Sequence, residues 1–445
     1  MNLKEKFISD ADKIVLNLSH RETIKFNIGR YEQAFYKGLN NYKNLELGKK
    51  YLNFKKSQVF RNWSKYLLRF EKNAIKHGAN VFWASNSDEA IQYIQKIIEL
   101  DKSKLVVKTK SMVSEEIGLN EFLDSIKMEY YETDLGEFIV HLAGEKPYHI
   151  LTPAMHKSRK DVSQLFSAKF AMKPDSTPEE ITKFVRKFLK DKFFHADLGI
   201  TGANFLVAET GSVVLTENEG NGLMTGAFPK TQIVIAGIEK IIPEMKDLNF
   251  FLPILSQHGT GQKITAYNSI FTGVNTHEKS LVIILLDNGR TELFRNVPQN
   301  RALTCIRCGA CLNFCPIYKN VGGYTYNSVY SGPIGSVITP FFKGFKDYAH
   351  LSFASSLCGR CSEKCPMKIP IHSLILANRN KSVDQSISSL SERVLIHKFA
   401  KASSIFYKLP FTNLKNLIVK SIFKKSKNQK RILPVIKKSF RKRMK

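Results

Sequence analysis

Cysteine is absent from most of this 445-residue chain, because all seven cysteines fall between positions 305 and 365. No stretch approaches the roughly 18 consecutive apolar residues of a membrane-spanning helix. The N-terminus mixes acidic and basic residues at helical spacing, so it does not match the charged and then apolar pattern of a signal peptide. We therefore expect a cytoplasmic protein whose thiols stay reduced.

Nucleotide-binding patterns are also missing. No G-x-G-x-x-G motif follows a predicted strand, and this is the pattern that binds the pyrophosphate of flavins and nicotinamides in Rossmann folds. If the chain takes part in a redox reaction, we expect the centre that oxidises the substrate to lie on a partner.

Acidic residues are absent from the last part of the chain. Residues 401–445 contain fifteen Lys or Arg and no Asp or Glu, which is about half of the net charge of +29. Apolar residues are interleaved with these cations, a pattern typical of contact with an anionic membrane surface or an acidic partner. The alternative is a solvated tail; nucleic-acid binding is a further alternative that we do not expect. The protein could therefore be peripheral on the inner face of the cell membrane.

The cysteines form two runs that each end in Cys-Pro, CIRCGACLNFCP (305–316) and SSLCGRCSEKCP (355–366). The first has the spacing of bacterial ferredoxins, in which three cysteines hold one cubane and the fourth reaches the other cluster. Zinc would need fewer thiols, and disulfides are disfavoured in a reducing compartment. The runs therefore predict iron–sulfur clusters.

Aligning the two runs position by position pairs Ser355 with Cys305. We expect two [4Fe-4S] clusters, the first held by Cys305, Cys308, Cys311 and Cys365, and the second by Cys315, Cys358 and Cys361. The second site lacks one thiolate. It could hold a [3Fe-4S] cluster, or a four-iron cluster with a non-cysteine ligand or an open iron.

The rest of the chain predicts helices over residues 1–75 and then an α/β region. Strands are expected at 78–85, 104–111, 129–144, 149–153, 205–210, 212–218 and 232–237, and helices at 87–100, 114–126, 158–171 and 178–194. This alternation predicts a doubly wound, Rossmann-like sheet.

Polar residues crowd two of the predicted strand ends, namely Glu209, Thr210, Glu217, Asn218 and Asn221. Open α/β sheets bind ligands at such edges, so these residues are candidates for a ligand pocket, although Asn and Gly also build turns. Other candidates are weaker, since isolated histidines and lysines are commonly structural: His141, His149, His156, His195, Lys108 and Lys110. We identify no catalytic residue.

ETGSVVLTENEGN (209–221), together with both cysteine runs, YSGPIGSVITP (330–340) and KIPIHSLIL (368–376), resembles the lactate utilization protein B family. The resemblance implies an α/β lactate-utilization domain similar in fold to isomerases and CoA transferases, followed by a mainly α-helical two-cluster ferredoxin-like domain. We expect an N-terminal helical region (1–75), the α/β domain (76–290), the 4Fe-4S domain (295–385) and a basic amphipathic tail (386–445).

The resemblance also implies a function. Family members are iron–sulfur subunits of a three-protein system that oxidises L-lactate to pyruvate and allows growth on lactate. The chain would then pass single electrons from the other subunits to an acceptor in or near the membrane. The alternative is that the α/β domain is itself a catalytic small-acid oxidoreductase, with the clusters as its electron exit. Whether the chain alone is an enzyme stays open at this point.

Overall fold

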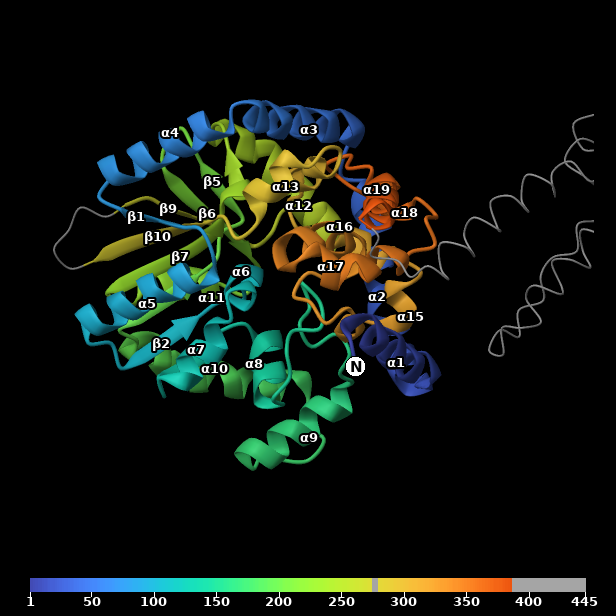
Figure 1. Cartoon of the computed structure of the whole chain (residues 1–445). Coiled ribbons are helices and arrows are strands. Elements are labelled where there is room, and N and C mark those ends of the chain that lie inside the picture. Colours follow the sequence, from blue (N-terminus) through green and yellow to red (C-terminus); the bar gives the residue numbers. More distant parts are fainter. Residues whose placement is uncertain (274–278, 386–445) are drawn as a thin grey trace, which may run out of the picture. The chain divides into compact units, whose positions relative to one another are not determined.

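Two β-sheets and the helices around them form the first half of the fold, and a helical region containing all the cysteines completes it (Figure 1). This computed structural model describes residues 1–273 and 279–385. The basic tail expected at 386–445 lies outside the described residues. Within the described part, no helix is both long enough and apolar enough to cross a bilayer.

The larger sheet has six strands, and every neighbouring pair in it is parallel. Its spatial order is β1 (Asn80–Ala84), β10 (Ser280–Leu286), β7 (Thr231–Gly237), β4 (Leu198–Thr201), β2 (Leu105–Lys108) and β3 (Glu129–Glu132). The chain moves outward from β2 to β3 and then returns inward through β4, β7 and β10. The order of the strands therefore reverses between β2 and β4, and ligands bind at such a switch point in open α/β sheets.

Both faces of the sheet are buried at its central strands β7 and β10, which are largely apolar. On β10, Val282 and Ile284 face α5 (Ser87–Asp101), α6 (Met112–Glu116) and α7 (Leu119–Ser125). Leu281 and Ile283 face the opposite side, where α4 (Trp63–Lys76) and the second sheet pack. Near β2 that side is covered by α8 (Leu135–Leu142), α9 (Arg159–Phe170) and α10 (Pro178–His195).

The second sheet has four strands in the order β8 (Ile241–Ile242), β5 (Phe205–Val207), β6 (Ser212–Glu217) and β9 (Tyr267–Phe271). Gly211 makes the turn between β5 and β6 with a left-handed φ of +68°. A Cβ atom there would lie 2.1 Å from the backbone nitrogen of Ala74, so α4 can approach this turn only because the residue is glycine. α11 (Asn221–Ala227) and α12 (Leu248–Thr260) follow β6 and β8.

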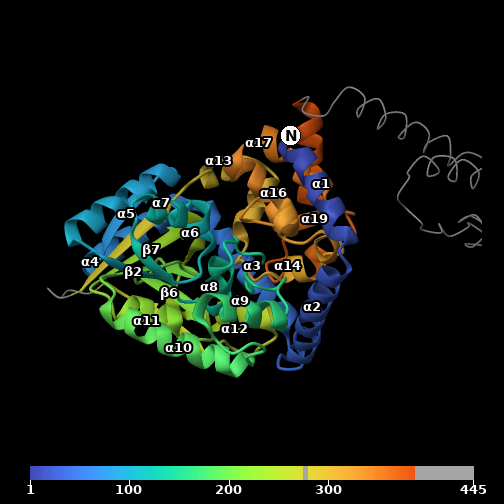
Figure 2. The ribbon, with the colours of Figure 1, turned by 90° about the horizontal axis from the view of Figure 1, so that it is seen from below.

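The cysteine region consists of short helices and two longer ones, α16 (Gly332–Lys343) and α19 (Ile371–Asp384). The short helices are α13 (Arg290–Arg295), η3 (Gln299–Thr304), α14 (Ala310–Asn313), α15 (Tyr318–Val321), η4 (Tyr324–Tyr326), α17 (Phe345–Tyr348), η5 (Ala349–Phe353) and α18 (Arg360–Glu363). The N-terminal helices α1 (Leu3–Leu16) and α2 (Leu18–Leu39) pack against this region (Figure 2), while α3 (Leu45–Arg61) packs beside the second sheet.

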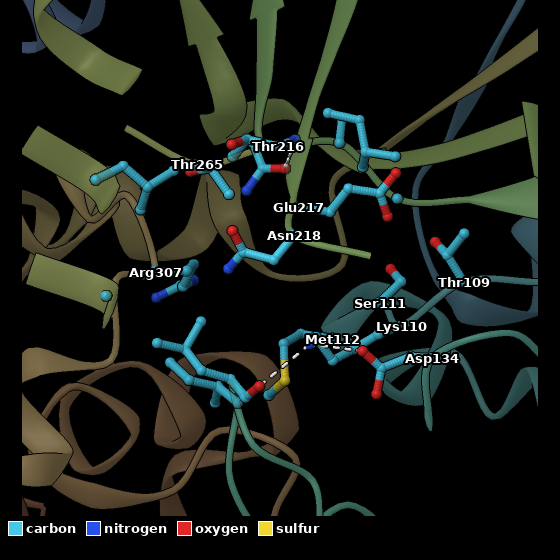
Figure 3. A pocket seen from close by; sticks show the side chains of 18 of the residues that line it. Thr109, Lys110, Ser111, Met112, Asp134, Thr216, Glu217, Asn218, Thr265 and Arg307 are labelled. Carbon is cyan, nitrogen blue, oxygen red and sulfur yellow. Dashed lines mark hydrogen bonds and ion pairs between the residues drawn. The ribbon is translucent and has the colours of Figure 1, made fainter. Parts of the chain in front are cut away.

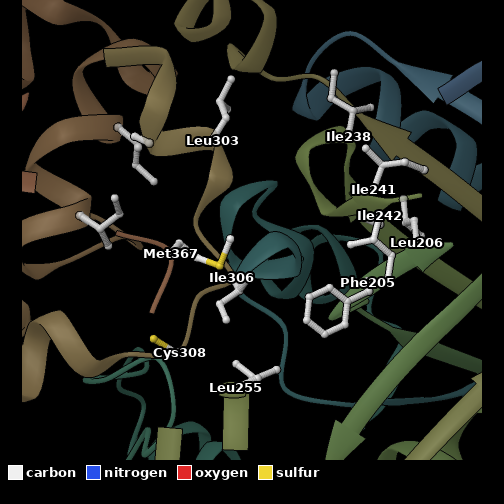
Figure 4. Close-up of a cluster of buried hydrophobic side chains, with 14 of the residues drawn as sticks. Phe205, Leu206, Ile238, Ile241, Ile242, Leu255, Leu303, Ile306, Cys308 and Met367 are labelled. Carbon is white, nitrogen blue, oxygen red and sulfur yellow. The ribbon is translucent and has the colours of Figure 1, made fainter. Parts of the chain in front are cut away.

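One continuous hydrophobic core joins the sheets to the cysteine region. Ile306 and Cys308 of the first cysteine run belong to the same buried cluster as Phe205 and Ile241 of the second sheet (Figure 4). Met367, which follows the second Cys-Pro, is also part of it. The cysteine loops are therefore held against the α/β region by buried apolar contacts, which exclude water from their inner side.

The predicted doubly wound α/β fold is confirmed, but three local expectations were wrong. The strand expected over 129–144 ends at Glu132, and α8 begins after Asp134, whose side chain caps it by accepting from the Glu137 N–H at 3.0 Å. Residues 149–153 form no regular element. The helix expected at 114–126 is two helices, because Gly118 interrupts it with a φ of +70°.

Candidate functional site

The first cysteine run turns tightly after η3. Arg307 and Gly309 both have left-handed φ values, 59° and 75°, and α14 begins directly after Gly309. The turn lets the Arg307 N–H donate to Cys305 Sγ at 3.4 Å. After the run, the Tyr318 N–H lies 3.5 Å from Cys315 Sγ. Such N–H donors stabilise negative charge on sulfur and help to set the potential of an iron–sulfur cluster.

The structure brings cysteines of the two runs together. The pKa of Cys308 is raised by burial and then by the negative charges of Cys305 and Cys365. Burial and then Cys305 raise the pKa of Cys365 to about 12. Coulombic effects weaken with distance, so Cys365 lies with the first three cysteines of the other run.

Cys315 of the first run likewise interacts with cysteines of the second run, Cys358 and Cys361. Burial and then the charge of Cys315 raise the pKa of Cys361 to about 11, and Cys358 acts in the same direction. The charge of Cys361 also raises the pKa of Cys311, so the two groups of cysteines lie next to each other. Buried thiols with raised pKa values resist ionisation unless a cation compensates them. The donor set therefore fits iron, which holds its ligands as thiolates.

The two groups of cysteines differ in exposure. Cys308, Cys311 and Cys365 are buried, and Cys305 is partly buried. In the other group, Cys315 and Cys361 are buried but Cys358 is exposed. One group therefore lies inside the protein against the α/β region, and the other opens to the surface.

Three buried basic side chains, Lys56, Lys240 and Arg307, interact electrostatically with Cys305. Burial lowers the pKa of Lys240 to about 8 and of Lys56 to about 7, although Glu239 and Cys305 oppose the shift in both. Burial also acts against the charge of Arg307, but Cys305 and neighbouring anions outweigh it and raise the pKa. Three cations near one thiolate would offset the negative charge of a four-thiolate cluster.

A cavity of about 330 Å³ lies at the switch point of the larger sheet (Figure 3). It is lined by residues that follow β2 (Thr109, Lys110, Ser111) and β4 (Gly202, Ala203, Asn204), and by the end of β6. Arg307 points into it from the cysteine region, on the side opposite Lys110 and Asp134 (Figure 3). Arg307 thus touches both the cavity and Cys305.

The polar cluster predicted from the sequence is split by the structure. Glu217, Asn218 and Asn221 line the cavity, whereas Glu209 and Thr210 belong to the turn at the other end of β6. The Glu209 carboxylate accepts from the Met245 N–H at 2.8 Å.

Two of the cavity residues have their functional groups engaged. Glu217 accepts from the N–H groups of Gly222 and Leu223 at 2.6 and 2.8 Å, and so holds the start of α11. Asn218 exchanges two hydrogen bonds with Gln262, each 3.0 Å long. Both side chains therefore shape the cavity wall.

Three residues that line the cavity carry a buried polar atom with no hydrogen-bond partner within the described part of the chain, namely Thr109 Oγ1, Asn221 Oδ1 and Arg307 Nη1. Lys240 lines it as well. Buried polar groups are usually hydrogen-bonded, so these atoms are suited to a polar ligand or to water. Sequence reasoning missed Thr109, Lys240 and Arg307, although Arg307 stands inside the cysteine motif.

The four candidate histidines and the two candidate lysines have structural partners. His141 contacts the Tyr130 hydroxyl at 3.1 Å, and His156 contacts Glu145 at 2.6 Å. His149 accepts from the Leu151 N–H at 3.1 Å, and exposed His195 contacts a carbonyl of its own helix. Lys108 is buried and paired with Glu132, and Lys110 pairs with Asp134 at 3.0 Å.

Comparisons with known proteins match both halves of this arrangement. The LUD domain family matches residues 67–289, and the 4Fe-4S dicluster domain family matches residues 301–369. Lactate utilization protein B of Bacillus cereus (strain B4264) and that of Bacillus thuringiensis (strain Al Hakam) are each 41% identical over 358 residues, covering 78% of this chain and 75% of the relative. A DUF162 family protein from Deinococcus radiodurans aligns with 50% of this chain and 97% of its own, with 13% identity and a TM-score of 0.29.

Proposed function

Because the chain belongs to the lactate utilization protein B family, we propose that it is the iron–sulfur electron-transfer subunit of a complex that oxidises L-lactate to pyruvate. The observation that carries the proposal is the crossed grouping of the cysteines. Two adjoining groups, one buried and one reaching the surface at Cys358, suit a two-step path for electrons from the interior to a docked acceptor.

The ligands follow from this grouping. We assign Cys305, Cys308, Cys311 and Cys365 to the first cluster, and Cys315, Cys358 and Cys361 to the second. One-electron transfer is the chemistry that such clusters supply. Around the first cluster, Lys56, Lys240 and Arg307 would balance the added negative charge, and the shared core would exclude water.

Lactate oxidation releases two electrons, and the chain has no recognisable flavin or nicotinamide motif. The centre that takes the electron pair from lactate would therefore lie on a partner subunit. Two adjoining one-electron carriers would receive the pair in turn and deliver the electrons singly.

Anaerobic absorbance spectroscopy tests this proposal. L-lactate should bleach the cluster bands of this chain when the partner subunits are present, and should leave them unchanged with the purified chain alone. Fast bleaching of the chain alone would make this subunit the dehydrogenase. Absence of iron, or bound zinc, would contradict the carrier function altogether.

A second candidate function rests on the cavity. Its unpartnered donor Arg307 Nη1, its acceptor Asn221 Oδ1 and its cation Lys240 suit a small acid that carries a carboxylate and a hydroxyl group. The α/β region would then bind lactate or pyruvate itself, directly beside Cys305. This is the arrangement that a catalytic small-acid oxidoreductase would need.

Titration calorimetry on the cluster-loaded chain tests the second candidate with L-lactate and pyruvate. Thr109→Val removes an unpartnered hydroxyl from the cavity at nearly constant volume and should weaken binding by several fold. Thr182→Val, on an exposed position of α10, is the matched control. If neither acid binds the wild-type chain, this candidate is wrong, while electron transfer through the chain still stands.

The acceptor and the membrane contact are expectations from the sequence alone. Each surface cation contributes about 1 kcal/mol of attraction near an anionic bilayer, and salt weakens it. Truncation after Leu390 should therefore abolish sedimentation with anionic vesicles at low salt and leave the clusters intact. Equal sedimentation of the two proteins would refute the contact.

A further inference from the structure

The two cysteine runs follow the same backbone course from Arg307 and from Leu357 onward. Leu357 and Gly359 have left-handed φ values of 53° and 82°, matching Arg307 and Gly309 in the first run. The carbonyl of Gly359 accepts from the Ser362 N–H at 3.0 Å, as that of Gly309 accepts from the Leu312 N–H at the same distance. Each glycine is followed by a four-residue helix. The second run therefore forms the same ligand loop as the first.

Ser355 stands in this loop where the first run has Cys305. The Leu357 N–H donates to Ser355 Oγ at 3.2 Å, and the Arg307 N–H donates to Cys305 Sγ at 3.4 Å. In both runs the N–H group two residues later donates to this side chain, so the serine oxygen and the cysteine sulfur are both directed back into the loop. The serine oxygen therefore corresponds to the sulfur that is missing beside Cys358 and Cys361.

The neighbouring serine and glutamate side chains are less suited than Ser355 to be this fourth ligand. Ser362 is held by His372, through a 2.7 Å contact with its ring and a 3.1 Å bond from its N–H. Ser356 is exposed and corresponds to Ile306, which points into the core of the first run. Glu363 pairs with Lys364 at 2.9 Å.

Arg379 fixes the segment that carries Ser355. Its Nη2 donates to the Ser355 carbonyl at 2.7 Å, and its Nε donates to the Ser352 carbonyl at 2.9 Å. Two bonds from one guanidinium hold the backbone rigidly.

We propose that Ser355 Oγ is the fourth protein ligand of the second cluster. That cluster is then a four-iron cubane in which three irons are held by cysteine sulfur and one by the serine oxygen. The inference rests on the proposed two-cluster function. The hydroxyl proton passes to solvent as the iron–oxygen bond forms, and no oxidation state changes. Because its iron would lack a cysteine thiolate, we expect this iron to be lost first on exposure to air.

Mössbauer spectroscopy and iron analysis of the anaerobically purified full chain test this ligand. The wild type should hold about eight irons, with one iron site of the second cluster distinct from the thiolate-ligated sites. Ser355→Ala should drop to about seven irons and show the paramagnetic resonance signal of an oxidised three-iron cluster. Ser355→Cys should keep about eight irons, lose the distinct site and release iron more slowly in air.

Ser356→Ala is the matched control, because it removes an exposed neighbouring hydroxyl and should leave iron content and spectra unchanged. A three-iron second cluster in the anaerobic wild type would overturn the inference. So would a Ser355→Ala variant that keeps its distinct iron site. In both cases the two-cluster carrier would survive, whereas a wild-type chain without iron–sulfur spectra would refute the proposed function itself.

Discussion

Arg307 joins the cavity to Cys305: its backbone N–H donates to Cys305 Sγ at 3.4 Å, and its guanidinium lines the space at the switch point of the sheet. The guanidinium also lies 4.7 Å from the centre of the Tyr330 ring and pairs with Glu239 at 3.4 Å. A ligand in the cavity would therefore be separated from the first cluster by a single residue. Arg307 therefore connects the wall of the cavity to the first cysteine run.

Crossed ligation makes a specific prediction for cysteine variants. Cys365→Ala should damage the cluster of Cys305, Cys308 and Cys311, although Cys365 lies in the other run. Cys315→Ala should damage the cluster of Cys358 and Cys361. Paramagnetic resonance of the reduced variants distinguishes the two clusters, and loss of only the cluster nearest in sequence would contradict the assignment.

The buried cations should tune the first cluster. Lys240→Met removes a positive charge that interacts with Cys305, so the reduced and more negative cluster is stabilised less. We expect the reduction potential of this cluster to fall, on the order of tens of millivolts, in a spectroelectrochemical titration. Lys96→Met, at an exposed position of α5, should leave the potential unchanged. An equal shift in both variants would indicate a general effect of net charge.

His258 should make stability depend on pH. Burial lowers its pKa in the folded protein to about 4, below its ordinary value of 6.5. The unfolded chain therefore binds the proton first, so this contribution is fully present above pH 6.5 and is lost as the pH falls toward 4. We expect about 2 kcal/mol to be lost between pH 7.5 and 5.

Anaerobic denaturant titrations at these two pH values measure the loss. His258→Gln should show a smaller difference between them, although its stability at pH 7.5 is also lower. His195→Gln replaces an exposed histidine and should keep the wild-type difference. An unchanged difference in His258→Gln would mean that other groups control the response.

Gly211 should tolerate no side chain. In Gly211→Ala, the new Cβ meets the backbone of Ala74 at 2.1 Å, in a strained left-handed conformation, so unfolding should cost at least 2 kcal/mol less than in the wild type. Gly29→Ala is the matched control, because nothing lies within 4 Å of its Cβ and α2 gains helix propensity. It should be neutral or stabilising by up to about 1 kcal/mol. Equal denaturation midpoints for both variants would refute the close approach.

Local patterns predicted the elements that local forces control. The apolar run QIVIAG (232–237) and the first-turn Pro178 correctly predicted β7 and α10, whereas the apolar run of β10 was not recognised as a strand. The segment EFIVHLAG was misread because α8 is buried and so apolar around most of its circumference, which hides the helical period. Its capping residue Asp134 was the signal that could have corrected this.

Long-range folding determined what the sequence could not predict. Thr109 follows a strand, Lys240 ends a short 3-10 helix and Arg307 lies in a cysteine loop, and only the packing of the two regions brings them to one cavity. The separation of Glu209 from Glu217 could not be predicted either, because it depends on the six-residue strand β6, which places the two side chains near its opposite ends. The cysteine spacing, in contrast, reflects the geometry of a cofactor and can be interpreted without the fold.

The packing of α1 and α2 on the cysteine region bears on how the protein matures. Phe7 meets Tyr326 edge to face, with their ring centres 5.7 Å apart, and Arg21 donates to Asn320 at 3.2 Å. During synthesis, α1 and α2 are therefore made long before residues 320–326, against which they pack. The N-terminal cover and the cysteine loops can come together only after both have been synthesised, so insertion of iron and sulfide before that point would meet cysteine loops without this cover.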